Sequence, residues 1–130
     1  MLQCISRRGR LAIKAVMTIG ERSDAQHPLA SKQLADLLKL PERYLENLLQ
    51  KLVHDKILKS VRGPRGGYQL GREAEKITAL DILMSLNASE KEAADPMLDP
   101  IVLDEREFFE GLRIFTIEKL IADYRRHKFA

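Results

Sequence analysis

The sequence lacks features that define several classes of protein. Its 130 residues contain one cysteine, Cys4, so no internal disulfide can form, as is usual in a reducing compartment. There is no tryptophan, and no apolar run is long enough to span a membrane. The N-terminus also lacks the apolar segment of a signal peptide. We therefore expect a cytoplasmic protein whose core is built mainly from Leu, Ile, Val and Ala.

Charge is divided unevenly along the chain. Residues 1–72 hold 14 Lys and Arg against 6 Asp and Glu, a balance of +8, whereas residues 73–130 have a balance of −5. A basic half joined to an acidic half is typical of a protein whose first half approaches a polyanion. Chance scatter of charges over a solvated surface can give the same counts. The uneven charge therefore indicates a polyanionic partner only together with the sequence pattern.

Residues 31–70 contain two predicted helices followed by a basic hairpin. Ser31 is expected to cap the first helix, which ends near Leu38, and Pro41 opens a second helix that runs to about Asp55. The connection between them is short, as in a helix-turn-helix unit. The second helix has an apolar stripe at helical spacing, which must be buried. The stripe consists of Leu45, Leu48, Leu49, Leu52 and Val53.

Residues 59–70 are expected to form a wing, which is two short strands around a tight turn. The run Gly63, Pro64, Arg65, Gly66 and Gly67 is typical of such a turn. The same glycines occur in phosphate-binding loops of enzymes, but here no Lys-Ser or Lys-Thr pair follows and the segment precedes a strand. A helix beside a basic hairpin indicates a winged helix-turn-helix.

A helix is also predicted before this unit. It is capped by Ser6 and ends near Arg22, and it carries Arg7, Arg8 and Arg10 in its first turns. Cations are disfavoured at this end of a helix by the helix dipole, so the cluster indicates an anionic partner. A solvated first turn is the alternative.

The C-terminal part of the chain is expected to form a dimer. Residues 87–100 form a polar connection with two prolines, and helices return over 101–130, where Thr116 caps the last one. Two apolar stripes run along these helices, and a partner subunit is the simplest cover for the stripe that its own domain leaves open. The predicted dimerisation residues are Phe108, Leu112, Phe115, Ile117, Ile121 and Tyr124.

Two segments carry a resemblance to a known family. They are SVRGPRGGYQL at residues 60–70 and the Tyr44-Leu45-Glu46 triplet in the preceding helix. With them the chain resembles the bacterial winged-helix repressors that include the iron–sulfur cluster regulator, the nitric-oxide-sensitive repressor and the regulator of cysteine metabolism. The resemblance implies a mostly α fold with a small β wing, residues 1–86 as the DNA-binding domain and a long C-terminal dimerisation helix.

The resemblance also implies how DNA is bound. A homodimer would bind a roughly palindromic operator in double-stranded DNA, with helix 41–55 in the major groove and wing 61–68 at the minor groove or backbone. Glu46 and Arg62 stand at the positions that help to read bases in members of this family. A carboxylate can accept a hydrogen bond from cytosine, and an arginine suits guanine or a narrow minor groove. The predicted DNA-binding residues are Arg8, Arg10, Ser31, Arg43, Tyr44, Glu46, Asn47, Lys51, Arg62, Arg65 and Gly66.

The sequence departs from the family pattern where a signal would be sensed. Cluster-binding relatives place three cysteines in the connection before the long helix, but residues 87–100 contain neither Cys nor His. We therefore predict no cysteine-ligated cluster and no cofactor. Redox sensing through Cys4, or an atypical metal site made with the three histidines, stays open although no ligand spacing supports it. A small molecule or a protein partner is the other possible effector.

Two further functions compete with DNA binding. An acid–base enzyme would need more than the glutamates of residues 105–118, because no nucleophile or metal set accompanies them. A winged helix that binds only protein would not need an arginine-rich wing or a basic N-terminal half. The sequence therefore predicts a homodimeric transcriptional repressor that is not an enzyme.

Overall fold

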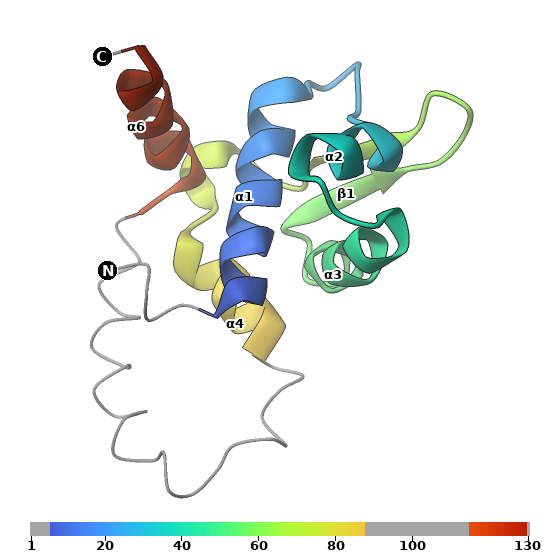
Figure 1. The fold of residues 1–130 in the computed structure, drawn as a ribbon, viewed down its shortest axis with the longest axis horizontal. Coiled ribbons are helices and arrows are strands. Elements are labelled where there is room, and N and C mark those ends of the chain that lie inside the picture. The colour runs from blue at the N-terminus through green and yellow to red at the C-terminus, as the bar shows by residue number, and fades with distance from the viewer. Residues whose placement is uncertain (1–5, 88–114, 130) are drawn as a thin grey trace, which may run out of the picture.

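The computed structural model describes residues 6–87 and 115–129 (Figure 1). This part of the chain is mostly helical and holds one two-stranded antiparallel sheet, and none of its helices is long and apolar enough to cross a bilayer. The elements in order are α1 (Arg7–Arg22), α2 (Ser31–Leu38), α3 (Glu42–His54), β1 (Leu58–Val61), β2 (Gly67–Leu70), the 3-10 helix η2 (Ala74–Lys76), α4 (Ala79–Asn87) and α6 (Ile117–Phe129).

Helix α1 is the centre of the fold. Its predicted cap is confirmed, because the Ser6 hydroxyl accepts a hydrogen bond from the Gly9 amide at 3.1 Å. The apolar face of α1 is fully buried, and α1 packs against α2, α3, α4, α6 and β2. Figure 1 shows α1 between two parts of the molecule, with α6 on one side and α3 and the wing on the other. The helix-turn-helix with its wing and the C-terminal helix therefore share one scaffold.

Helices α2 and α3 form the predicted helix-turn-helix. Lys39 ends α2 in the left-handed conformation, with a φ of 56°, and the chain turns directly into α3. Two boundaries differ from the expectation. Helix α3 begins at Glu42, with Pro41 as its cap. The cap of α2 is Ala30, and Ser31 is the first helical residue. The Ser31 hydroxyl is therefore available for contacts outside its own helix.

The wing consists of β1 and β2, whose register pairs Ser60 with Tyr68. Its turn is closed by the Gly66 amide, which donates to the Gly63 carbonyl at 2.9 Å. On its outer edge β2 also pairs with Leu29, through two backbone hydrogen bonds of 2.9 and 2.8 Å between Leu29 and Tyr68. The segment before α2 thereby fixes the base of the wing beside the helix-turn-helix.

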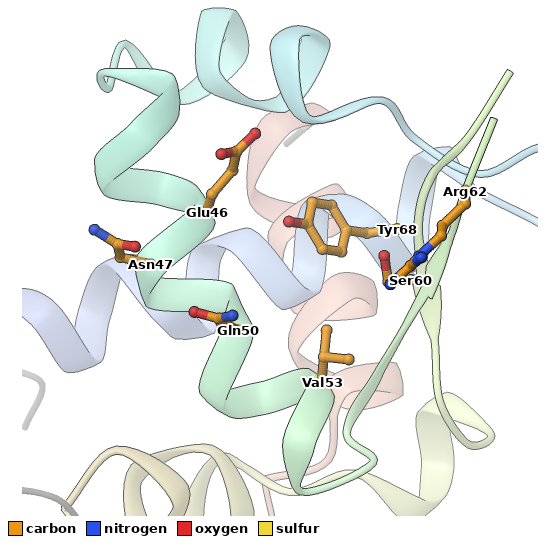
Figure 2. A pocket seen from close by; sticks show the side chains of 7 residues that line it. All are labelled: Glu46, Asn47, Gln50, Val53, Ser60, Arg62 and Tyr68. Atoms are coloured by element: carbon orange, nitrogen blue, oxygen red, sulfur yellow. The ribbon is translucent and has the colours of Figure 1, made fainter. Parts of the chain in front are cut away.

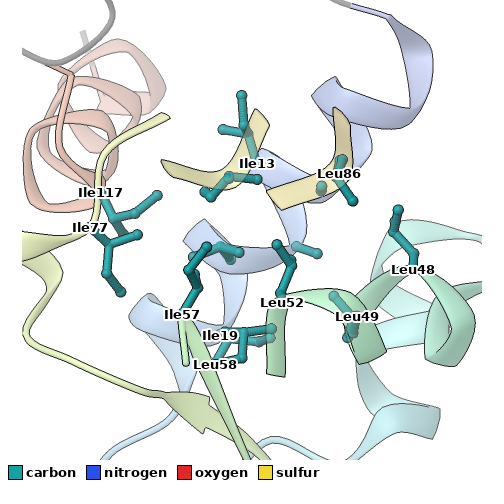
Figure 3. Packing of buried hydrophobic residues seen from close by; sticks show 14 of the residues in the cluster. Ile13, Ile19, Leu48, Leu49, Leu52, Ile57, Leu58, Ile77, Leu86 and Ile117 are labelled. Atoms are coloured by element: carbon teal, nitrogen blue, oxygen red, sulfur yellow. The ribbon is translucent and has the colours of Figure 1, made fainter. Parts of the chain in front are cut away.

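Helix α6 is joined to the same domain through its first residues. Ile117 donates to the carbonyl of Ile77 at 2.8 Å, and Ala79 donates to the carbonyl of Phe115 at 2.9 Å. Thr78 and Thr116 face each other in this pairing and cap α4 and α6, and the cap at Thr116 confirms the expectation from the sequence. The side chain of Ile117 enters the central core beside Ile77 (Figure 3).

The structure corrects two of the predicted dimerisation residues. Ile117 is 0% exposed and Ile121 is 9% exposed within a single chain, so both belong to the core of this chain. The amphipathic pattern of α6 is therefore explained by docking onto α1 and η2. Phe115 is half-buried and Tyr124 is 51% exposed. Phe108 and Leu112 lie outside the described residues, as does most of the predicted connection 87–100.

A polar contact joins α4 to the end of α3. The Ser85 hydroxyl, on a buried position of α4, donates to Asp55 Oδ2 at 2.5 Å. This hydrogen bond, followed by one from His54, lowers the pKa of Asp55 below its ordinary value of 3.8. Because the folded-state pKa is depressed, the contact stabilises the fold above the unfolded-state pKa, and this contribution is lost as the pH falls through the folded-state value.

Replacing Ser85 by Ala should raise the pKa of Asp55 towards its ordinary value, because the largest cause of its depression is removed. Carbon-13 NMR titration of the aspartate carboxyl groups measures this change. Asp24 is the internal control, since its pKa is lowered by the Gln26 amide and by His27, and it should titrate identically in both proteins. An unchanged Asp55 titration in the Ser85→Ala protein would contradict the assignment.

Candidate nucleic-acid interface

A groove separates the exposed face of α3 from the wing (Figure 2). Its volume is about 450 Å³, and we call it the α3–wing groove. Side chains of α3 line one wall and side chains of the wing line the other, and the Tyr68 hydroxyl points towards α3. The lining residues are Glu46, Asn47, Gln50, Val53, Ser60, Arg62 and Tyr68.

The two walls of the α3–wing groove follow from elementary periodicities. On α3 the lining positions lie on the face opposite the buried leucines, at the spacing of neighbouring helical turns. On the wing, Ser60 and Arg62 are two residues apart and therefore point to the same face of the hairpin. Tyr68 is the cross-strand partner of Ser60 and joins them there. The groove therefore combines a cation, a carboxylate, two amides, two hydroxyls and an apolar side chain.

The hydroxyl of Ser31 lies within hydrogen-bond distance of two carboxylates, those of Glu42 and Glu46. Ser31 Oγ is the donor, and it lies 2.9 Å from Glu42 Oε1 and 3.4 Å from Glu46 Oε1. Burial raises the pKa of Tyr68, and the charges of Glu46 and Glu42 raise it further. Tyr68 therefore stays protonated at neutral pH and can donate a hydrogen bond. Glu46, Ser60 and Tyr68 also line a second hollow of about 370 Å³, between the start of α2 and the wing turn.

The structure brings several of the predicted DNA-binding residues together. Glu46, Asn47 and Arg62 line the α3–wing groove, and Ser31 and Gly66 line the adjoining hollow with Glu46. Arg8 and Tyr44 meet at a third hollow, where α1 approaches the turn between α2 and α3. Arg10, Arg43 and Arg65 are exposed outside these three hollows, and Lys51 is half-buried.

Sequence reasoning missed part of the groove. Gln50 lies on the exposed face of α3, and its helical spacing from Glu46 and Asn47 could have identified it. Ser60 and Tyr68 required the register of the hairpin, because only their pairing shows that both side chains face α3. Glu42 required the contact with Ser31, since nothing in its spacing separates it from an ordinary first-turn carboxylate.

Known proteins share this arrangement of a helix-turn-helix beside a hairpin. The family model described as "Rrf2: Iron-dependent Transcriptional regulator" matches residues 5–107. The chain belongs to the Rrf2 family. Among its relatives, the HTH-type transcriptional regulator CymR of Bacillus subtilis is 37% identical over 82 residues, which is 63% of this chain. The HTH-type transcriptional regulator IscR of Escherichia coli is 29% identical over 85 residues, or 65% of the chain.

These alignments cover 59% of CymR and 52% of IscR, so this Rrf2 chain matches little more than half the length of these curated relatives. Solved structures match over a larger share. CymR, titled the global cysteine regulator of B. subtilis, has a TM-score of 0.73 at 30% identity, with 91% of this chain and 95% of that chain covered. IscR of T. potens has a TM-score of 0.79 at 28% identity, with 97% and 91% covered. These structures confirm the winged-helix fold.

The residues of this Rrf2 protein do not fit a cysteine-ligated iron–sulfur cluster. Such clusters are held by several thiolates, and the 130 residues include only Cys4, which lies outside the described part. Within residues 6–87 and 115–129, no group of three or more His, Cys, Asp and Glu side chains is placed to hold a metal ion.

Proposed function

We propose that this protein is a sequence-specific DNA-binding transcriptional regulator in which α3 enters the major groove and the wing contacts the adjacent minor groove or backbone. The α3–wing groove is the observation that carries the proposal. It presents acceptors, amides and a guanidinium on the two elements that winged helices place against DNA. Side chains of these types read base edges by hydrogen bonding.

The cations around the groove support phosphate contacts on both sides of it. Arg65 is exposed on the wing turn, and Arg8 borders the hollow where α1 meets the helix-turn-helix. Arginine is suited to phosphate because its guanidinium can donate two parallel hydrogen bonds. Such contacts fix the register of a protein on the duplex, while base contacts select the sequence. We assign Arg8, Arg10 and Arg65 to positioning, and Glu46, Asn47 and Arg62 to base reading.

A homodimer is part of the proposal. Helix α6 lies across α1 from α3 and the wing, so pairing through α6 leaves both DNA-binding elements of each protomer accessible (Figure 1). Tyr124, half-exposed on α6, supplies apolar surface for the contact. Two-fold symmetry would place two recognition helices about one turn of DNA apart or a multiple of it, and would match a roughly palindromic operator.

The regulator we propose acts as a repressor in the bacterial cytoplasm. A protein bound in the major groove of a promoter can exclude other proteins from the same DNA. Its effector is a small molecule or a protein partner. Helix α4 would relay this signal to α3, because the Ser85 hydroxyl on α4 donates a hydrogen bond to Asp55 at the end of α3.

The decisive experiment is binding-site selection from a library of random-sequence duplex DNA, followed by affinity measurements at several salt concentrations. We expect one enriched, roughly palindromic motif, and an affinity that falls steeply with salt because phosphate contacts release counterions. Each phosphate neutralised should contribute about −0.9 to the slope of log affinity against log salt. Failure to enrich any motif would contradict the proposal, and a flat salt dependence would contradict the phosphate contacts.

A further inference from the structure

We propose that Glu42 is a second base-reading carboxylate, held beside Glu46 by Ser31, so that the operator must present a cytosine to each of them. This inference rests on the proposed function and deepens it. Glu42 reads the base directly, whereas Ser31 is a positioning residue that acts through the two carboxylates. The two cytosines lie one or two base-pair steps apart in the operator, one for each glutamate.

The geometry places both carboxylates on the side of α3 that meets the wing. The Ser31 hydroxyl lies within 3.4 Å of an oxygen of each, although the three residues come from two different helices. The Tyr68 hydroxyl points towards α3 beside Glu46 (Figure 2), and its pKa is raised by burial and then by the charges of Glu46 and Glu42. A hydroxyl has one hydrogen to donate, so Ser31 orients the pair while most of their acceptor capacity stays unused.

Unused carboxylate oxygens have a definite preference on DNA. Phosphates repel them, and most base edges in the major groove present acceptors that do the same. Two bases present an amino donor in this groove, cytosine through N4 and adenine through N6, and glutamate pairs with cytosine because the adenine donor stands beside the N7 acceptor. A duplex with guanine or thymine at these places would bury two negative charges against acceptors, which is strongly unfavourable, and adenine would offer only a donor beside an acceptor. The pair acts mainly by rejecting incorrect DNA.

The spacing of the pair determines how far apart the bases are. Residues four apart on a helix are separated by about 6 Å along its axis, because each residue rises 1.5 Å. Successive base pairs are about 3.4 Å apart. Glu42 and Glu46 therefore reach base pairs that are adjacent or one step removed.

The test compares the wild-type protein with Glu42→Ala by selection from random-sequence duplex DNA. We expect the wild-type motif to hold two cytosines per half-site, one or two steps apart, on either strand. In the Glu42→Ala protein one of these positions should become unselective, with discrimination reduced about 10-fold, the usual scale of a single base-pair mismatch. Asp36→Ala is the matched control, because it removes one exposed negative charge from α2 outside the groove. It should leave the motif unchanged.

Ser31→Ala tests the positioning role. It should weaken selection at both cytosine positions together, while the salt slope and the melting temperature stay close to those of the wild type. A merely structural role of Ser31 would not produce this combination of results. The inference is overturned if Glu42→Ala selects the same motif with the same stringency, or if Asp36→Ala changes it equally. A wild-type protein that enriches no motif would instead overturn the proposed function.

Discussion

Replacing Ile117 by Glu is expected to abolish cooperative folding of the domain. Ile117 is fully buried in the core, where it packs beside Ile77. A carboxylate at this position would be buried without a partner, or α6 would have to leave the domain. Either outcome costs several kcal/mol, a large share of the roughly 5–15 kcal/mol that stabilises a domain. Urea unfolding followed by circular dichroism measures the loss.

Tyr124→Glu is the matched control for this experiment. It introduces the same charge on the same helix, at a side chain that is 51% exposed. The variant should fold with nearly wild-type stability, and light scattering should report a monomer if α6 forms the proposed dimer contact. A folded, monomeric Ile117→Glu protein would instead show that Ile117 faces a partner, as the sequence pattern had suggested.

Replacing Arg62 by Ala is expected to weaken operator binding about 10- to 100-fold, the effect of losing a good bidentate base contact worth about 1–3 kcal/mol. Arg62 is exposed on the wing and is one of the residues that line the α3–wing groove. Its removal should reduce affinity for the operator more than affinity for random DNA. A binding competition between the two duplexes measures the change in their ratio.

Arg65→Ala provides the comparison, because Arg65 has the same charge and lies three residues away outside the α3–wing groove. It should weaken binding to operator and random DNA by similar factors and make the salt slope shallower by about one. The base-reading role of Arg62 is refuted if the two variants lose affinity in the same way, since both would then act on phosphates alone.

The elements of this fold could be predicted because their causes are local. Ser6, Thr78 and Thr116 cap the helices that follow them, and each cap depends on residues within three positions along the chain. The stripe from Leu45 to Leu52 specifies a helix with one buried face. The turn of the wing requires a glycine at position 63, because Gly63 has a positive φ of 117°.

The candidate site could be predicted only in part. Glu46 and Arg62 were found because the chain resembles a family, and the structure places both in the α3–wing groove. Tyr68 depended on the pairing of β1 with β2, and Glu42 on a hydroxyl eleven residues away. Helical spacing cannot identify such contacts, because they join different elements.

By itself the sequence determined the helices, the wing and the unequal division of charge, since caps, periodicities and turn residues act over a few positions. The tertiary structure alone decided which residues of the apolar pattern in the C-terminal helix are covered by their own domain. Ile117 and Tyr124 belong to one amphipathic pattern, but one is buried against the core and the other is exposed. Periodicity shows that a face must be covered, whereas only the packing of α6 against α1 and η2 shows what covers it.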